Sequence, residues 1–124
     1  MTESQIQEAL ADCLRLKYPD VLFHSDFGSG VKLTMGQAVR QKRLNGGRRA
    51  WPDLFIACPT KGLPGLLIEL KKDGTRLKKK NGDWASDHIA EQAKVLYELR
   101  IAGYEAQFAV GYDEAVAIIE NYLR

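Results

Sequence analysis

The apolar residues at the start of the chain recur with the spacing of one face of a helix. They are Ile6, Leu10, Cys13 and Leu14. This spacing predicts an amphipathic helix with a single apolar stripe. Thr2 or Ser4 can cap its first turn, and Pro19 ends it, so we expect the helix to cover residues 4–17.

Apolar runs of strand length follow this helix. Residues 21–24 form a short β-like run, and residues 54–58 and 66–70 are two longer ones. The segment 59–65 between the longer runs holds two prolines and two glycines, which is typical of a hairpin loop. Residues 105–110 predict a last strand. The sequence therefore predicts four strands, of which the first three precede residue 71 and the last covers residues 105–110.

Further helical segments complete the predicted order. Residues 87–102 predict a helix with Ser86 or Asp87 as its cap and Gly103 at its end. Asp113 can cap a final helix that runs to residue 123, and a short helix is predicted within residues 35–43. A strand–helix–strand unit places its two strands parallel. The predicted fold class is thus α/β, with the core order αβββαβ, an extra C-terminal helix and a mixed sheet flanked by helices.

Length and composition fit one globular domain. The chain has 124 residues, of which 45% are hydrophobic and 27% charged, so we expect a single domain over residues 1–124. Cys13 and Cys58 lie among apolar neighbours, which favours free thiols in a reducing compartment. The sequence shows neither a secretory leader nor an apolar run long enough to span a bilayer. We therefore expect a cytoplasmic protein.

The small net charge of +2 hides an uneven distribution. Residues 1–26 hold five acids and two bases, for a sum of −3, and residues 83–124 hold eight acids and three bases, for −5. Twelve of the 18 basic residues lie in two stretches, 32–49 and 71–80. Two basic stretches are explained either by solvated loops or by a polyanionic partner, and nucleic acid is the commonest polyanion.

The ends of the predicted hairpin carry three charged residues. Asp53 precedes its first strand, and Glu69 and Lys71 lie on its second strand. Side chains alternate along a strand, so Glu69 and Lys71 share a face. If the loop is centred near Gly62, Asp53 lies opposite Lys71, and Phe55 opposite Glu69. All three charged side chains then cluster on one face.

A surface ion pair would be the simpler explanation of these charges. However, the neighbouring residues of both strands are all apolar, which is typical of strands covered on both faces. Carboxylates there would be partly buried and would need a cation. Two close carboxylates suit Mg²⁺ or Mn²⁺, and a nearby lysine can stabilise charge on a phosphate. The pattern therefore predicts metal-assisted hydrolysis of a phosphodiester.

These residues also carry a family resemblance. Pro52-Asp53 followed by Glu69-Leu70-Lys71 resembles the signature of the PD-(D/E)XK nuclease superfamily, in its usual order of elements. This resemblance implies a restriction-endonuclease-like αβββαβ core. Within that superfamily the chain is similar to the VRR-NUC domains over residues 3–123. The similar segments are Gly47-Arg48-Arg49-Ala50-Trp51-Pro52-Asp53, Leu67-Ile68-Glu69-Leu70-Lys71, Gln92 and Gly103-Tyr104. Small stand-alone members of this family occur in bacteriophages and bacteria.

The resemblance implies a role for each matching residue. Asp53 and Glu69 would be metal ligands, with the Leu70 carbonyl as a third, and Lys71 would be the catalytic lysine. Gln92 matches a site-lining glutamine, and its spacing from Ile89 and Leu96 places it on an inward helix face.

The family also has an acid on its first helix. Glu3 falls close to the apolar stripe of that helix, whereas Glu8 falls almost opposite to it. We choose Glu3, with Glu8 as the alternative. A glutamate favoured there only by the helix dipole is the simpler reading of either position.

The basic stretches would then contact DNA. The candidate contacts are Arg48, Arg49, Lys72, Arg76, Lys78, Lys79 and Lys80. The resemblance implies branched DNA, such as four-way (Holliday) junctions, as the substrate of a homodimer. Two alternatives stay open. One is a non-catalytic nucleic-acid-binding module on the same fold, and the other is a restriction-like nuclease that depends on base sequence.

Overall fold

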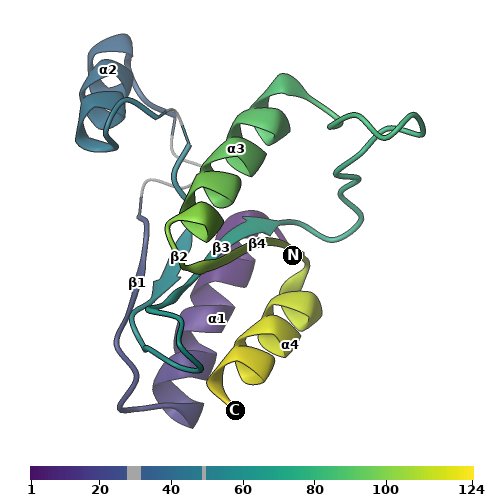
Figure 1. Ribbon diagram of the computed structural model, residues 1–124. Coiled ribbons are helices and arrows are strands. Elements are labelled where there is room, and N and C mark those ends of the chain that lie inside the picture. Colours follow the sequence, from purple (N-terminus) through teal and green to yellow (C-terminus); the bar gives the residue numbers. More distant parts are fainter. Residues whose placement is uncertain (28–31, 49) are drawn as a thin grey trace.

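A computed structural model of the chain describes residues 1–27, 32–48 and 50–124 (Figure 1). Within these ranges the chain forms four helices and four strands. In chain order they are α1 (Glu3–Lys17), β1 (Phe23–Ser25), α2 (Met35–Leu44), β2 (Leu54–Ile56), β3 (Leu66–Lys71), α3 (Asp87–Ile101), β4 (Glu105–Val110) and α4 (Tyr112–Leu123). The predicted element order is confirmed, including the short helix between the first two strands.

The strands form one mixed sheet in the order β1-β2-β3-β4. The pairs β1–β2 and β2–β3 are antiparallel, and β3–β4 is parallel. Helix α3 connects the two parallel strands, as the strand–helix–strand pattern predicts. The sheet therefore has the mixed character expected from the sequence.

Helices cover both faces of this sheet (Figure 1). Helices α1 and α4 pack against one face, where Leu66, Ile68 and Leu70 of β3 join the larger apolar core. Helix α3 covers the other face, where Leu67 packs against Leu96 and Ala106. Since side chains alternate along β3, Glu69 and Lys71 fall on the α3 side with Leu67.

The hairpin register differs from the predicted one by two residues. Leu54 pairs with Ile68, and Phe55 pairs with Leu67 rather than with Glu69. A tight turn at Lys61 and Gly62, both with positive φ, closes the loop between paired residues 60 and 63. The β2 side of the loop is one residue longer than the β3 side, so the strands are offset. Continuing this register places Asp53 opposite Glu69, whereas we expected Lys71.

The final helix begins differently from the prediction. Its cap is Gly111 rather than Asp113, and Gly111 has a φ of 89°. The Gly111 N–H donates to the Lys71 carbonyl at 2.8 Å. A Cβ atom here would lie 2.1 Å from Asp73 Oδ1. The positive φ therefore favours glycine at the end of β4, whereas the exposed Asp73 side chain can move aside for a Cβ atom.

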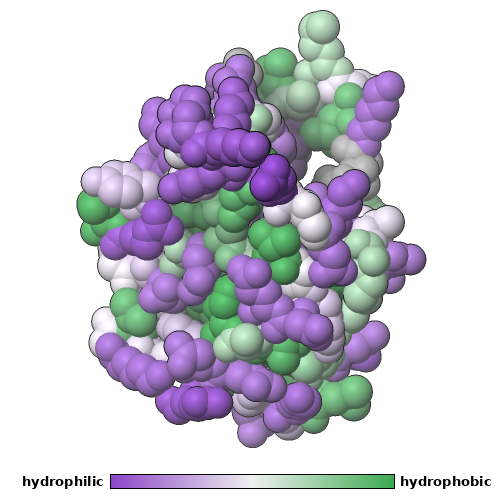
Figure 2. Space-filling model, turned by 90° about the vertical axis from the view of Figure 1, so that its right-hand side faces the viewer, coloured by the Kyte–Doolittle hydropathy of each residue, from purple (hydrophilic) through white to green (hydrophobic). Residues whose placement is uncertain are grey.

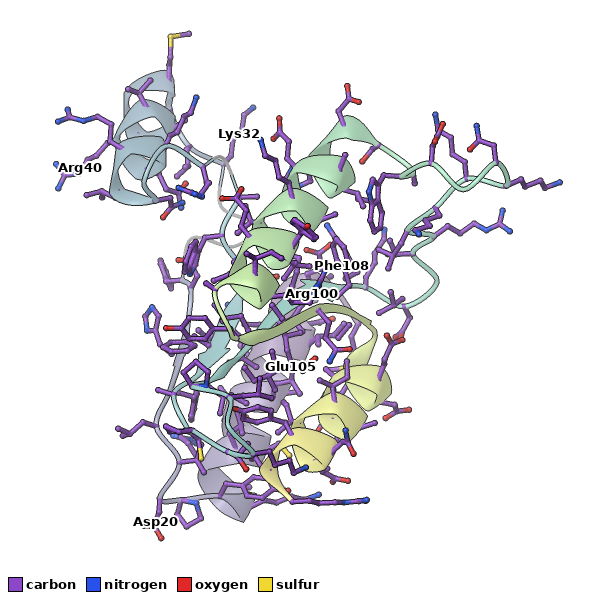
Figure 3. All side chains as sticks on the ribbon, in the orientation of Figure 1. Asp20, Lys32, Arg40, Arg100, Glu105 and Phe108 are labelled. Atoms are coloured by element: carbon purple, nitrogen blue, oxygen red, sulfur yellow. The ribbon has the colours of Figure 1, made fainter. Side chains whose placement is uncertain are left out.

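Helix α2 stands apart from the sheet (Figure 1) and has no buried residue. The side chain of Arg40, on this helix, points away from the body of the molecule (Figure 3). A capping box at Thr34 and Gln37 stabilises its first turn. Within the described ranges, none of the helices combines the length and the apolar character needed to cross a bilayer.

Candidate active site

Four polar or charged side chains are buried among the described residues. They are Asp53, Glu69, Lys71 and Gln92, with exposed fractions of 7%, 4%, 6% and 6%. All four are residues that the sequence analysis selects for a site. Buried charges are rare without a partner, so their position needs a physical explanation.

Asp53 is held from two sides. Its carboxylate Oδ2 accepts a hydrogen bond from the backbone N–H of Leu70 on β3, at 2.8 Å. Its carbonyl oxygen accepts two more from the end of β1, from the Asp26 N–H at 2.9 Å and from Ser25 Oγ at 3.2 Å. Asp53 lies one residue before β2, beyond the last residue pair of β1 and β2. These hydrogen bonds therefore fix the position of Asp53.

Glu69 is held from helix α3. Its Oε1 accepts a hydrogen bond from Gln92 Nε2, which confirms that Gln92 lies on the inward face of α3. The other amide atom, Gln92 Oε1, is buried and has no hydrogen-bond partner among the described residues. A buried acceptor without a partner is unfavourable unless a donor or a cation reaches it.

The environment of Glu69 favours its neutral form when no cation is present. The pKa of Glu69 is raised from 4.5 to about 9. Burial is the largest cause, and the negative charge of Asp53 is the second. The Lys71 ammonium opposes this rise in the pKa, while the charge of Glu3 adds to it. Two carboxylates in one buried place thus repel each other, and the nearby lysine only partly compensates.

The donor set at this place fits a hard divalent cation. Asp53 and Glu69 offer carboxylate oxygens, Gln92 offers its unpartnered amide oxygen, and the Leu70 carbonyl lies in the backbone beside them. Mg²⁺ and Mn²⁺ prefer such oxygen ligands. Across the described ranges, no group of three or more His, Cys, Asp and Glu side chains could hold a metal. A cation here would therefore rely on two carboxylates and neutral oxygens.

The two candidate acids of the first helix lie in different surroundings. Glu3 is half-buried, and its negative charge contributes to the raised pKa of Glu69. Glu8 is exposed and lines an open cleft beside Gln7, Ser25 and Phe27. The burial of Glu3 and its effect on Glu69 favour Glu3 over Glu8 as the first-helix acid near the site.

In the first basic stretch, the structure describes the contacts of Arg48. Arg48 Nη2 forms an ion pair with Glu98 Oε2 of α3 at 2.5 Å, and Arg48 Nη1 donates to the Gly46 carbonyl at 3.0 Å. The guanidinium that we expect at a phosphate is thus bound to a protein carboxylate here. Arg49 lies outside the described residues.

The second basic stretch forms an extension between β3 and α3. Its members Lys72, Arg76, Lys78, Lys79 and Lys80 are all exposed. Residues 78 and 84 form a β-bridge, and the Lys79 N–H donates to the Asp83 carbonyl at 2.8 Å. These contacts fold residues 77–85 into a short ribbon, which we call the basic ribbon.

An aromatic contact attaches the basic ribbon to the sheet. Trp84 packs against Phe108 of β4, with 5.8 Å between ring centroids. Lys78 Nζ lies 4.8 Å from the centre of the Trp84 ring, which is a cation–π distance. Figure 2 turns the side that carries this extension towards the viewer, and hydrophilic side chains gather over the upper part of that face. The basic ribbon is therefore anchored at its base, with its lysines in solvent.

Sequence reasoning did not find Gln7, Ser25 and Asp26, which hold the backbone of Asp53. Gln7 lies one helical turn after Glu3, but no sequence pattern marks the pairing of α1 with the end of β1. It also did not find Glu98, the partner of Arg48. Both are long-range contacts between polar residues that carry no motif.

Comparisons with known proteins support the fold. No protein-family model and no curated protein sequence matches the chain. A solved structure described as a VRR_NUC domain protein matches with a TM-score of 0.73 and 24% identity, over 99% of this chain and 88% of the other. This confirms the predicted restriction-endonuclease-like α/β class and agrees with the VRR-NUC resemblance. The chain therefore has the fold of that VRR_NUC domain protein.

Proposed function

We propose that this protein is a divalent-metal-dependent nuclease of the VRR-NUC family that hydrolyses phosphodiester bonds of DNA. The observation that carries the proposal is the joint burial of Asp53, Glu69, Lys71 and Gln92 at one place on the α3 side of the sheet. A domain that only binds nucleic acid gives no reason to bury two carboxylates, a lysine and an unpartnered amide oxygen together. The proposed domain covers residues 1–124.

Each residue of the site has a distinct task in this proposal. Asp53 and Glu69 hold Mg²⁺ or Mn²⁺ together with the Leu70 carbonyl. When bound, the ion supplies positive charge that stabilises negative charge on the phosphate in the transition state. Lys71 places a second positive charge beside the same phosphate. Gln92 fixes the orientation of Glu69 through its N–H, and Glu3 adds negative charge that favours a cation at the site.

The basic residues of the two stretches provide contacts to the DNA backbone. The basic ribbon, with Lys72 and Arg76 before it, supplies one set, and the segment of Arg48 and Arg49 supplies another. Phosphate contacts of this kind position the duplex without reading its bases. This suits a substrate defined by its shape, and we propose branched DNA, such as a four-way junction, in the cytoplasm of a bacterial host.

A homodimer would bring two such sites to two strands of one junction. Light scattering on the purified chain tests this part of the proposal. We expect a molar mass of about twice the 13.9 kDa of one chain. A monomer at every concentration, with or without junction DNA, would contradict it.

A cleavage assay tests the activity itself. Linear, flapped and four-way DNA substrates are incubated with Mg²⁺ or Mn²⁺ and with the wild type, Asp53→Ala or Lys71→Ala. We expect the wild type to cut the branched substrates, and the two variants to bind them with cleavage reduced by a factor of about 100 or more. The matched control is Asp20→Ala, because Asp20 is exposed at the end of the molecule opposite the basic ribbon (Figure 3).

The outcomes separate the candidate functions. Normal cleavage by Asp53→Ala refutes the site. Binding without cleavage by the wild type under every condition indicates the non-catalytic module. Cleavage that follows base sequence on linear duplex indicates the restriction-like nuclease.

A further inference from the structure

A series of hydrogen bonds connects helix α1 to the backbone of Asp53. Gln7 Nε2 donates to Ser25 Oγ at 2.6 Å and to the Asp26 carbonyl at 2.7 Å. A side-chain amide nitrogen carries two protons, so it can make both bonds at once. Ser25 Oγ then donates to the Asp53 carbonyl at 3.2 Å, beside the Asp26 N–H at 2.9 Å.

This series acts at the point where the pairing of β1 with β2 ends. Strand β1 is only three residues long, and its pairing with β2 ends at Ser25 and Leu54. Asp53 lies just beyond that last pair. Its carbonyl depends on Ser25 and Asp26, and its carboxylate depends on the Leu70 N–H at 2.8 Å. A shift of the β1 end would therefore move the Asp53 backbone and loosen the carboxylate.

We propose that Gln7 is a positioning residue, which fixes the Asp53 carboxylate through Ser25 and the end of β1. The inference rests on the proposed function, because it concerns the carboxylate assigned there to the cation. Gln7 also lies one turn after Glu3 on α1. The same contacts therefore fix the helix that carries Glu3.

Mn²⁺ binding without DNA tests this inference on the full chain. Calorimetry gives the Mn²⁺ dissociation constant of the wild type, Gln7→Met, Ser25→Ala and Ser25→Thr. Methionine keeps the length of Gln7 without its donors, and threonine keeps the hydroxyl of Ser25. The matched control is Gln107→Met, because Gln107 is a half-buried glutamine of β4 that bonds to Glu105 Oε1. Amide hydrogen exchange of the metal-free protein is measured at the Leu70 N–H.

Loss of a residue that supports a ligand typically weakens metal binding by 10- to 100-fold. We expect a loss of about this size for Gln7→Met and Ser25→Ala, with faster exchange at the Leu70 N–H. Ser25→Thr and Gln107→Met should stay within about threefold of the wild type. Both changes break the same series of hydrogen bonds, so their effects should not add. The dissociation constant of the double variant Gln7→Met/Ser25→Ala should therefore lie within about threefold of that of the weaker-binding single variant.

Other results overturn the inference. Wild-type Mn²⁺ affinity in Gln7→Met, even with a lower melting temperature, means that Gln7 only stabilises the fold. If Gln7→Met does not fold, Ser25→Ala decides, since it keeps the bond from Gln7 to Asp26. A wild type that binds no Mn²⁺ refutes the proposed function and the inference together, whereas a binding wild type with unaffected variants refutes the inference alone.

Discussion

Glu69 shows how a single side chain links the fold to the proposed chemistry. It is 4% exposed, accepts a hydrogen bond from Gln92 and lies beside Asp53. Burial and the Asp53 charge raise its pKa to about 9, so the metal-free protein keeps it protonated at neutral pH. A cation at the site would reverse this preference, because its charge stabilises the carboxylate.

The raised pKa predicts how stability depends on pH. In the unfolded chain Glu69 loses its proton near pH 4.5, whereas the folded, metal-free protein holds it up to about pH 9. The folded state thus binds more protons within this window, and the free energy of unfolding falls as the pH rises through it. Glu69→Gln keeps a neutral side chain of the same shape and should lose this part of the pH dependence.

Urea unfolding in EDTA at pH 5 and pH 8 measures this effect. We expect the stability advantage of Glu69→Gln over the wild type to be larger at pH 8. The exposed acid Glu114 provides the control Glu114→Gln, which should follow the wild type at both values. Parallel behaviour of Glu69→Gln and the wild type would contradict the burial of a protonated Glu69.

The basic ribbon is the element at which the proposed DNA binding can be tested separately from the proposed cleavage. Its base is fixed by the contact of Trp84 with Phe108, while Lys79 and Lys80 at its tip are exposed. Three of the four buried site residues, Glu69, Lys71 and Gln92, lie on β3 and α3, the two elements that the extension connects. Removing charge at the tip should therefore weaken DNA binding and leave the buried carboxylates undisturbed.

Replacing Lys79 and Lys80 by alanine tests this separation. It leaves the contact of Lys78 with Trp84 intact. If both lysines contact phosphates, the slope of log K against log salt should become shallower by about 1.8, and cleavage at saturating DNA should stay near the wild-type rate. The charge-matched control is Arg15→Ala/Lys17→Ala at the end of α1. An unchanged slope would mean that the tip does not touch DNA.

At the scale of the whole molecule, helices on both faces of the sheet hold the residues of the site in place. Asp53 depends on α1 through β1, Glu69 depends on α3, and both lie near the end of β3. A cation held by Asp53 and Glu69 would bind only the folded arrangement. Ligands that bind only the folded state raise its stability in proportion to the logarithm of their concentration.

Mn²⁺ should therefore raise the melting temperature of the whole chain. At 100 times the dissociation constant the added stability is about 2.7 kcal/mol, which corresponds to a rise of about 10 °C in the melting temperature. Asp53→Asn should lose this gain, and Asp20→Asn should keep it. A melting temperature that does not respond to Mn²⁺, while calorimetry shows binding, would place the ion elsewhere than at Asp53.

The sequence by itself determined the elements and the side on which the charged residues lie. Asp53, Glu69 and Lys71 were expected on one face, and this survives the change in hairpin register because a shift of two residues preserves the alternation of side chains. The inward position of Gln92 followed in the same way from helical spacing. Local periodicity encodes both features, so they need no knowledge of distant contacts.

Only the tertiary structure decided which of these residues face one another. It pairs the position of Asp53 with Glu69 instead of Lys71, since the turn at Lys61 and Gly62 and one extra loop residue set the register. It also joins Arg48 to Glu98, and Gln7 to Ser25. These contacts depend on how loops close and how elements pack over long sequence separations, and no local pattern of residues specifies that geometry.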